Sequence, residues 1–182
     1  MEIFELEADP KRYCNFALAD PVRDGGIYDS FNGMPLASRW SAPAVTPAHE
    51  EDNAAELGDY ALLGTAPVFS LRALESLLDL LKPNGEMLPL RYRQAEYFAY
   101  NVTRVLPALD EDASVITRFP TGRVMSVNRY VFRPTVIGDV SVFKIPELAR
   151  AYVFVTGDFV QRVLSRGLTG FCFLPLWIGT DW

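Results

Sequence analysis

Residues 150–177, RAYVFVTGDFVQRVLSRGLTGFCFLPLW, contain the clearest signals in the chain for where strands and helices begin and end. Tyr152 to Val155 is a run of β-branched and aromatic side chains that is typical of a buried strand. Thr156 follows with a hydroxyl that can cap a helix, and Asp158 lies where the helix dipole favours a carboxylate. We therefore expect a strand that ends at Thr156 and leads directly into a helix.

The segment after Thr156 has the spacing of an amphipathic helix, with an apolar face made of Phe159, Val160, Val163 and Leu164. Gly167 is expected to end this helix in the left-handed conformation. Phe171 to Leu174 is typical of a second buried strand, which we expect to end at Pro175 because proline cannot donate a ladder hydrogen bond. This strand–helix–strand unit is scaffold, and its residues indicate no chemistry.

Composition and charge restrict the class of protein. With 182 residues, of which 49% are hydrophobic and 13% aromatic, the chain is expected to form one packed domain rather than a disordered one. The formal net charge is −6 and the sequence pI is about 4.8, so the average field repels nucleic acid and anionic membranes. We therefore expect neither as a partner.

The two cysteines and the N-terminus indicate the compartment. Cys14 and Cys172 are far apart among apolar neighbours, which favours buried thiols in a reducing environment. The first residues lack both the basic segment and the apolar segment of a secretory signal, and no apolar run is long enough to span a membrane. These features predict a cytoplasmic protein.

A second helix is predicted over residues 70–81. Ser70 is a capping residue, and Phe69 before it and Leu74 after it have the spacing of a hydrophobic staple. The apolar side chains recur at helical spacing: Leu71, Leu74, Leu77, Leu78 and Leu81. The turn residues 83–85 are expected to end this core-facing helix.

Most of the segment from 86 to 143 is typical of strands. A short turn at 120–122 separates two apolar-alternating runs, which predicts a hairpin. Residues 44–56 are expected to be a surface loop or short helix, and the whole of 1–57 to be loop-rich. The blocks of strands and helices predict a single α+β domain over 1–182, with a largely antiparallel sheet and a few packed helices.

The search for catalytic residues finds no convincing set. His49 is the only histidine and lies beside carboxylates in the softest segment, so it is interpreted as solvated rather than as a base. Zinc spacings and phosphate-binding loops are absent from the sequence, and Lys144 near Asp139 is weak support for a nuclease-like metal site. We predict no enzyme activity, catalytic residue, metal or cofactor.

Several ordered motifs in the C-terminal two-thirds resemble a known family. These are residues 70–81 followed by 83–86, then 97–105, 129–132, 143–147, 167–171, Pro175 and Trp177. Together they are similar to the eleventh family of bacterial polymorphic-toxin immunity proteins, formerly a domain of unknown function. The similarity covers roughly Gly58 to Trp177, the core expected at 58–177, and rests on turn residues and buried aromatics.

The resemblance implies a cytoplasmic protein that binds and neutralises a cognate secreted toxin. The acidic clusters Glu50-Glu51-Asp52 and Asp110-Glu111-Asp112, together with the aromatic side chains of Tyr92 and Trp40, are the candidate partner-binding residues. Two other hypotheses stay open. One is a small enzyme or ligand-binding domain that uses arginines such as Arg91, Arg93, Arg118, Arg123 and Arg129 around a pocket. The other is an oligomer, for example a homodimer, that pairs through an apolar surface.

Overall fold

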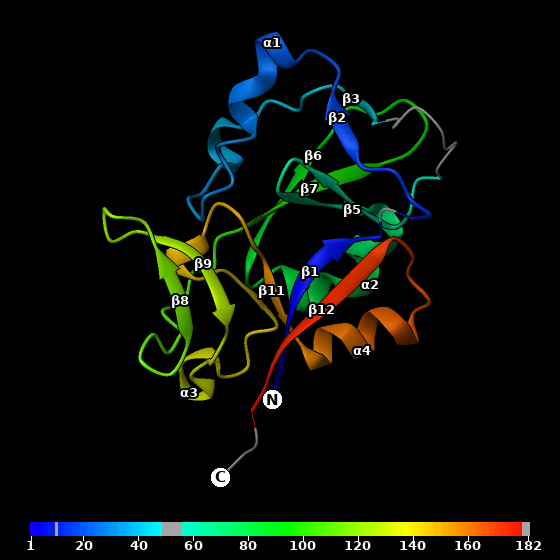
Figure 1. Ribbon diagram of the computed structural model, residues 1–182. Coiled ribbons are helices and arrows are strands. Elements are labelled where there is room, and N and C mark those ends of the chain that lie inside the picture. The colour runs from blue at the N-terminus through cyan, green and yellow to red at the C-terminus, as the bar shows by residue number, and fades with distance from the viewer. Residues whose placement is uncertain (10, 49–55, 180–182) are drawn as a thin grey trace.

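The computed structural model describes residues 1–9, 11–48 and 56–179, and strands dominate this part of the chain (Figure 1). They form a four-stranded sheet in the order β10-β11-β1-β12, a six-stranded sheet in the order β3-β2-β4-β5-β7-β6, and the separate pair β8-β9. Every pair of named strands is antiparallel except β2 with β4. The predicted α+β class with largely antiparallel sheets is confirmed.

The strands are β1 (Glu2–Ala8), β2 (Phe16–Leu18), β3 (Val45–Pro47), β4 (Tyr60–Leu63), β5 (Ala66–Ser70), β6 (Gly85–Pro89), β7 (Tyr97–Val102), β8 (Val115–Arg118), β9 (Val124–Arg129), β10 (Val142–Phe143), β11 (Phe154–Thr156) and β12 (Phe171–Ile178). The helices are α1 (Pro21–Asp24), α2 (Leu71–Leu81), α3 (Pro134–Ile137) and α4 (Gly157–Ser165), with 3-10 turns η1 (Gly25–Ile27), η2 (Ala37–Arg39) and η3 (Pro146–Leu148).

The C-terminal strand–helix–strand unit is completed by the first strand of the chain. β11 and β12 do not pair with each other; β1 lies between them and is antiparallel to both. Ile3 pairs with Thr156 on one side and with Trp177 on the other. The four-stranded sheet therefore joins residues from the two ends of the described chain (Figure 1).

The prediction that the last strand is buried and ends at Pro175 is wrong. β12 continues to Ile178 with a register shift beside Pro175, and about half of its residues are exposed. It is an edge strand, where proline is tolerated because the outer N–H groups have no ladder partner. The same edge position leaves Cys172 exposed, contrary to expectation, whereas Cys14 is buried; both are free thiols.

Helix α4 follows β11 directly, as the sequence predicts, but two local details differ. Thr156 occupies the N-cap position, yet its side chain makes no capping hydrogen bond. Phe159, Val160 and Val163 are buried, whereas Leu164 lies away from the core and is exposed. Gly167 follows the helix with φ of +58°, the left-handed conformation predicted for it.

The six-stranded sheet carries α2 immediately after β5. The hydroxyl of Ser70 accepts a hydrogen bond from the backbone N–H of Ala73 at 3.1 Å, which confirms the predicted cap. Leu77 and Leu81 are fully buried, but Leu78 is 39% exposed and lies at the margin of the apolar stripe. The face of α2 that packs against the core is therefore narrower than the spacing of its leucines suggests.

One apolar core lies where the two larger sheets and the helices α2 and α4 meet. It includes Leu6 of β1, Phe69 of β5, Leu77 of α2 and Phe159 of α4. The guanidinium of Arg162 on α4 also donates to the carboxylate of Asp79 on α2 at 2.8 Å. A second core fills the other side of the six-stranded sheet, and a third lies between the four-stranded sheet and the β8–β9 pair.

The N-terminal segment is more regular than its loop-rich sequence suggests. The expectation of a loop or short helix over 44–56 is wrong for Val45–Pro47, which forms β3 and pairs with β2, while residues 49–55 lie outside the described residues. In the described part of the chain no helix is long and apolar enough to cross a membrane.

Candidate partner-binding surface

The β8–β9 hairpin stands at one side of the molecule, away from α2 and α4 (Figure 1). Its inner side chains, Ile116, Val124 and Val127, pack on the third core. The pairing of β8 with β9 has register shifts between Val115 and Ile116 and between Thr117 and Arg118, so inward and outward side chains do not simply alternate along the strands. In this hairpin some of these outward residues are apolar.

Three apolar side chains of the hairpin are open to solvent. Val115 is 47% exposed, Phe119 44% and Met125 49%. Exposed aromatic and methionine side chains are enriched where protein surfaces bind partners. Phe119 is held rigidly at the turn, because its N–H donates to the carbonyl of Arg123 at 2.8 Å and its carbonyl accepts from the N–H of Gly122 at 2.9 Å.

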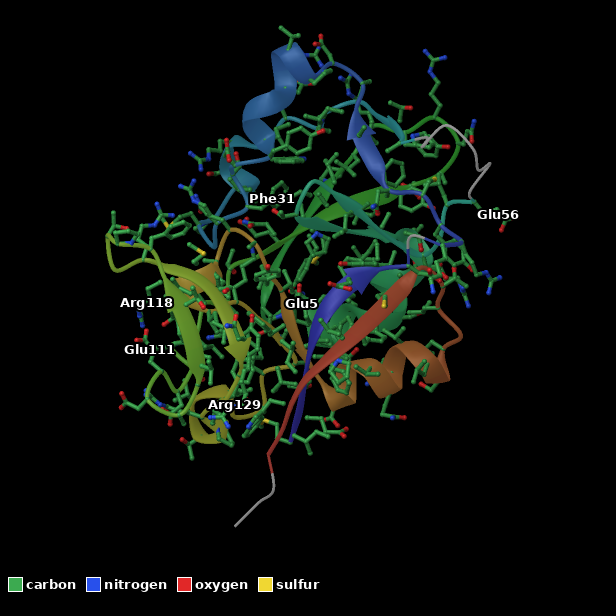
Figure 2. All side chains as sticks on the ribbon, viewed as in Figure 1. Glu5, Phe31, Glu56, Glu111, Arg118 and Arg129 are labelled. Carbon is green, nitrogen blue, oxygen red and sulfur yellow. The ribbon has the colours of Figure 1, made fainter. Side chains whose placement is uncertain are left out.

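The predicted acidic cluster at residues 110–112 lies at the base of this hairpin, where arginines surround it. Arg118 donates to Glu111 at 2.5 Å, and the two side chains meet on the outer side of the hairpin in Figure 2. Arg133 lies 3.8 Å from Asp110. Asp112 is exposed and forms no ion pair with the residues that the structure describes.

These contacts fix the shape of the acidic turn. The Asp110 carboxylate accepts from the backbone N–H of Ala113 at 3.2 Å, and Arg129 donates to the Ala113 carbonyl at 2.9 Å. Both partners of the Arg118–Glu111 pair are well exposed, so the pair contributes less than about 1 kcal/mol to stability. The charge of this surface is therefore mixed rather than uniformly acidic.

The two aromatic candidates both pack on the second core, on a different part of the molecule. Trp40 and Tyr92 are partly buried and pack on the second core, not on the third core with the hairpin. The indole N–H of Trp40 donates to the Pro89 carbonyl at 2.9 Å, and the Tyr92 ring contacts Phe16 edge-on at 5.5 Å. Both side chains pack against the protein, so neither is a freely exposed anchor for a partner.

A basic hollow of about 880 Å³ lies beside Trp40. Arg23, Arg39 and Arg91 line it, with Asp24 as the acidic residue of the lining. Arg23 donates to Asp24 at 2.6 Å, which leaves Arg39 and Arg91 as the cations without a carboxylate partner among the described residues. We predicted an acidic binding surface, whereas the charge of this hollow is positive.

The arginines of the alternative enzyme hypothesis do not converge on one pocket. Arg91 and Arg93 line a cavity beside Tyr92, whereas Arg118 and Arg123 line a different one beside η3. Arg129 is engaged with the turn carbonyl of Ala113. Within the described residues no group of three or more His, Cys, Asp or Glu side chains could hold a metal ion.

Sequence reasoning placed some candidates and missed others. The cluster Glu50-Glu51-Asp52 and His49 lie outside the described residues. The exposed apolar side chains of the hairpin were missed, although the sequence contains a signal for them. Val115 and Ile116 are consecutive, as are Val124 and Met125, and regular alternation along a strand would turn one residue of each pair away from the core.

Residues 89–176 match the model of the Immunity protein family (Imm11). The match confirms the family resemblance expected from the sequence. It runs from the end of β6 into β12 and contains the hairpin, the acidic turn at 110–112 and Tyr92, but not Trp40 or β1. The comparison with curated proteins gives no match.

Proposed function

Since residues 89–176 match the Imm11 immunity protein family, we propose that this chain binds and neutralises a cognate secreted toxin in the cytoplasm of the bacterium that makes the toxin. The family match supports a role in toxin immunity, and an immunity protein acts by binding rather than by turnover. The dispersed arginines favour this non-enzymatic role over the alternative enzyme hypothesis.

The β8–β9 hairpin is the surface that we propose contacts the toxin. The observation that carries this assignment is the exposure of Val115, Phe119 and Met125 on a two-stranded hairpin. This hairpin lies within the family match. A small set of apolar anchors inside a charged rim is the usual anatomy of a protein interface. Asp112, Glu111 and Arg118 supply that rim.

Charge contributes to this interface in a secondary way. The overall charge of −6 attracts a basic partner, and a toxin that acts on nucleic acid would present a basic cleft. Because Glu111 and Asp110 already contact arginines, Asp112 carries most of the free negative charge of the turn. The proposed partner is thus a protein, with neither nucleic acid nor membrane in that role.

Self-association is the weaker alternative. The edge strand β12 could pair with a second copy, but Pro175 removes a hydrogen-bond donor from it, a device that discourages edge-to-edge pairing. A homodimer therefore stays a prediction that sedimentation of the purified protein checks directly.

Coexpression with a candidate toxin, sought first in the gene next to this one, tests the proposal. Cells that make the toxin should grow when they also make the parent protein. The double variant Phe119→Ala/Met125→Ala should protect at least about tenfold less well, because the anchors carry most of the binding free energy. Leu164→Ala is the matched control, since Leu164 is an exposed apolar residue on α4 and also lies within the family match.

Protection that stays at the parental level in the double variant would reject the hairpin as the binding surface. Failure of the parent protein itself to protect against the neighbouring toxin would reject the proposed function. Circular dichroism and denaturant midpoints of the variants ensure that lost protection is not lost folding.

A further inference from the structure

A cavity of about 380 Å³ lies between the two larger sheets, where β1 faces the β4–β5 hairpin. Its lining includes Glu5 and Glu7 of β1, Tyr60 of β4, Cys172 of β12 and Tyr152 next to β11. Figure 2 shows Glu5 on β1 in the middle of the molecule, apart from Glu111 and Arg118 on the hairpin. This cavity is separate from the proposed toxin-binding surface.

Two glutamates of one strand line this cavity. Glu5 and Glu7 are two residues apart, so they lie on the same face of β1. Glu5 is only 9% exposed, and within the described residues no donor forms a hydrogen bond with its carboxylate. Burial, and secondarily the charge of Glu7, raise the pKa of Glu5 to about 7.

The hydroxyl of Tyr60, a residue of the lining, is shielded from the cavity and also has no partner. The side chain of Tyr60 is fully buried, and its hydroxyl makes no hydrogen bond to the described part of the protein. Burial, with a smaller contribution from Glu7, raises the pKa of Tyr60, so this hydroxyl lies close enough to Glu7 to sense its charge. Buried polar groups without partners are rare in native proteins and call for an explanation.

The chemistry of the wall selects the ligand. Two carboxylates repel anions, and within the described residues no group of three or more His, Cys, Asp or Glu side chains could hold a metal ion. The cavity is much larger than a single ion, and the ring of Tyr152, which is 37% exposed, adds aromatic surface. A planar or tetrahedral cation with several N–H donors would satisfy the carboxylates through charge-assisted hydrogen bonds and contact this ring favourably.

We propose that this cavity binds one organic cation, a guanidinium or primary ammonium group, between the carboxylates of Glu5 and Glu7. The source of the cation is either a free small molecule or a basic side chain of a bound protein. The site goes beyond the proposed function, because the family match begins at residue 89 and β1 lies outside it.

Titration of the purified full-length protein with agmatine tests the site without any toxin. We expect saturable binding at pH 8, seen as chemical-shift changes of residues that line the cavity. Glu5→Gln and Glu7→Gln should each weaken binding at least about tenfold, because each removes a charge-assisted contact. Glu2→Gln is the control, since Glu2 lies on the same strand with its side chain exposed and outside the cavity lining.

Absence of saturable binding by the parent, or equal binding by the Glu5 and Glu2 variants, would overturn the site. Glu5→Gln is expected to fold at least as well as the parent, so a negative result cannot be blamed on misfolding. If the toxin displaces agmatine, the cation is a side chain of the toxin; if both bind together, it is a free molecule. Protection against the toxin by the parent protein in cells tests the proposed function separately.

Discussion

Lys144 donates a hydrogen bond from its buried ammonium group to the backbone carbonyl of Phe31, 113 positions earlier in the chain, at 2.6 Å. The same ammonium donates to the carbonyl of Ala149 at 2.7 Å. Figure 2 places Phe31 in the N-terminal segment, so this lysine ties that segment to the C-terminal unit. The sequence suggested instead a weak metal-site role for Lys144 near Asp139.

Replacing Lys144 with methionine should lower the free energy of unfolding by about 1–3 kcal/mol at pH 7. One buried and one partly buried carbonyl oxygen lose their donor, which outweighs the removal of one desolvated charge. Urea denaturation of the parent and the variant measures the difference. An unchanged midpoint would show that the two hydrogen bonds of Lys144 contribute nothing to stability.

The pH dependence of the same variant has a definite sign. Burial lowers the pKa of Lys144 to about 8 from 10.5, so between these values the unfolded chain binds more protons than the native protein. The stability of the parent should therefore rise as the pH increases from about 8 to about 10.5, and Lys144→Met should lack this increment. Denaturation curves at several alkaline pH values compare the two slopes.

Glu5 should give the opposite behaviour at lower pH. Its pKa is raised from 4.5 to about 7, so the native protein holds a proton there that the unfolded chain has lost. The stability that this group contributes is complete below about pH 4.5 and disappears as the pH rises through about 7, at most about 3 kcal/mol.

Glu5→Gln should remove that loss, because the amide resembles the neutral acid, and should make the protein more stable than the parent at pH 8. The other titratable groups around Glu5 are Glu7 on its own strand and the hydroxyls of Tyr130 and Tyr152. Burial, then the charge of Glu5, raise the pKa of Tyr130, so this group titrates well above the window. Equal slopes for the parent and the variant would refute the assignment.

Neighbouring side chains on the two longer helices should respond differently to truncation. Leu77→Ala should destabilise by about 2–4 kcal/mol and Leu78→Ala by less than about 1 kcal/mol, because Leu77 is fully buried and Leu78 is partly exposed. The same contrast is expected between Val163 and Leu164 on α4. Guanidinium midpoints of the four variants check it, and similar values within each pair would mean that the faces are misplaced.

The acidic turn should affect the rate of toxin association more than the lifetime of the complex. Replacing residues 110–112 with Ser and Asn removes three carboxylates, of which Asp112 forms no ion pair with the described residues. The change should slow association at low salt by about threefold, with little effect at high salt. The cost in stability should be about 1 kcal/mol, because Asp110 also accepts from Ala113. Stopped-flow association rates of the parent and the variant at two ionic strengths measure this effect. Identical rates for the two proteins would show that the acidic turn does not contribute to association.

Local signals account for the parts of the fold that the sequence predicts well. Helix α2 begins at Ser70 because its cap, its staple and its leucine spacing lie within a dozen residues. The β8–β9 hairpin is equally local, since its turn joins the two strands directly. Such elements need no knowledge of the rest of the molecule.

The errors concern features that depend on distant partners. Pro175 was expected to end β12, but whether proline is tolerated depends on the edge position, which β1 establishes by pairing from the other end of the chain. The exposure of Cys172 has the same origin, because Cys172 lies on β12. Likewise, Glu5 lies in an alternating acidic strand that reads as solvated, and only the packing of the second sheet against it creates a cavity.

Hydrogen exchange of the purified toxin–immunity complex tests the central proposal most directly. If the β8–β9 hairpin binds the toxin, amides of residues 110–129 should be protected on complex formation, and those around Arg39 and Trp40 should exchange as in the free protein. Protection confined to the basic hollow beside Trp40, with the hairpin unchanged, would contradict the account.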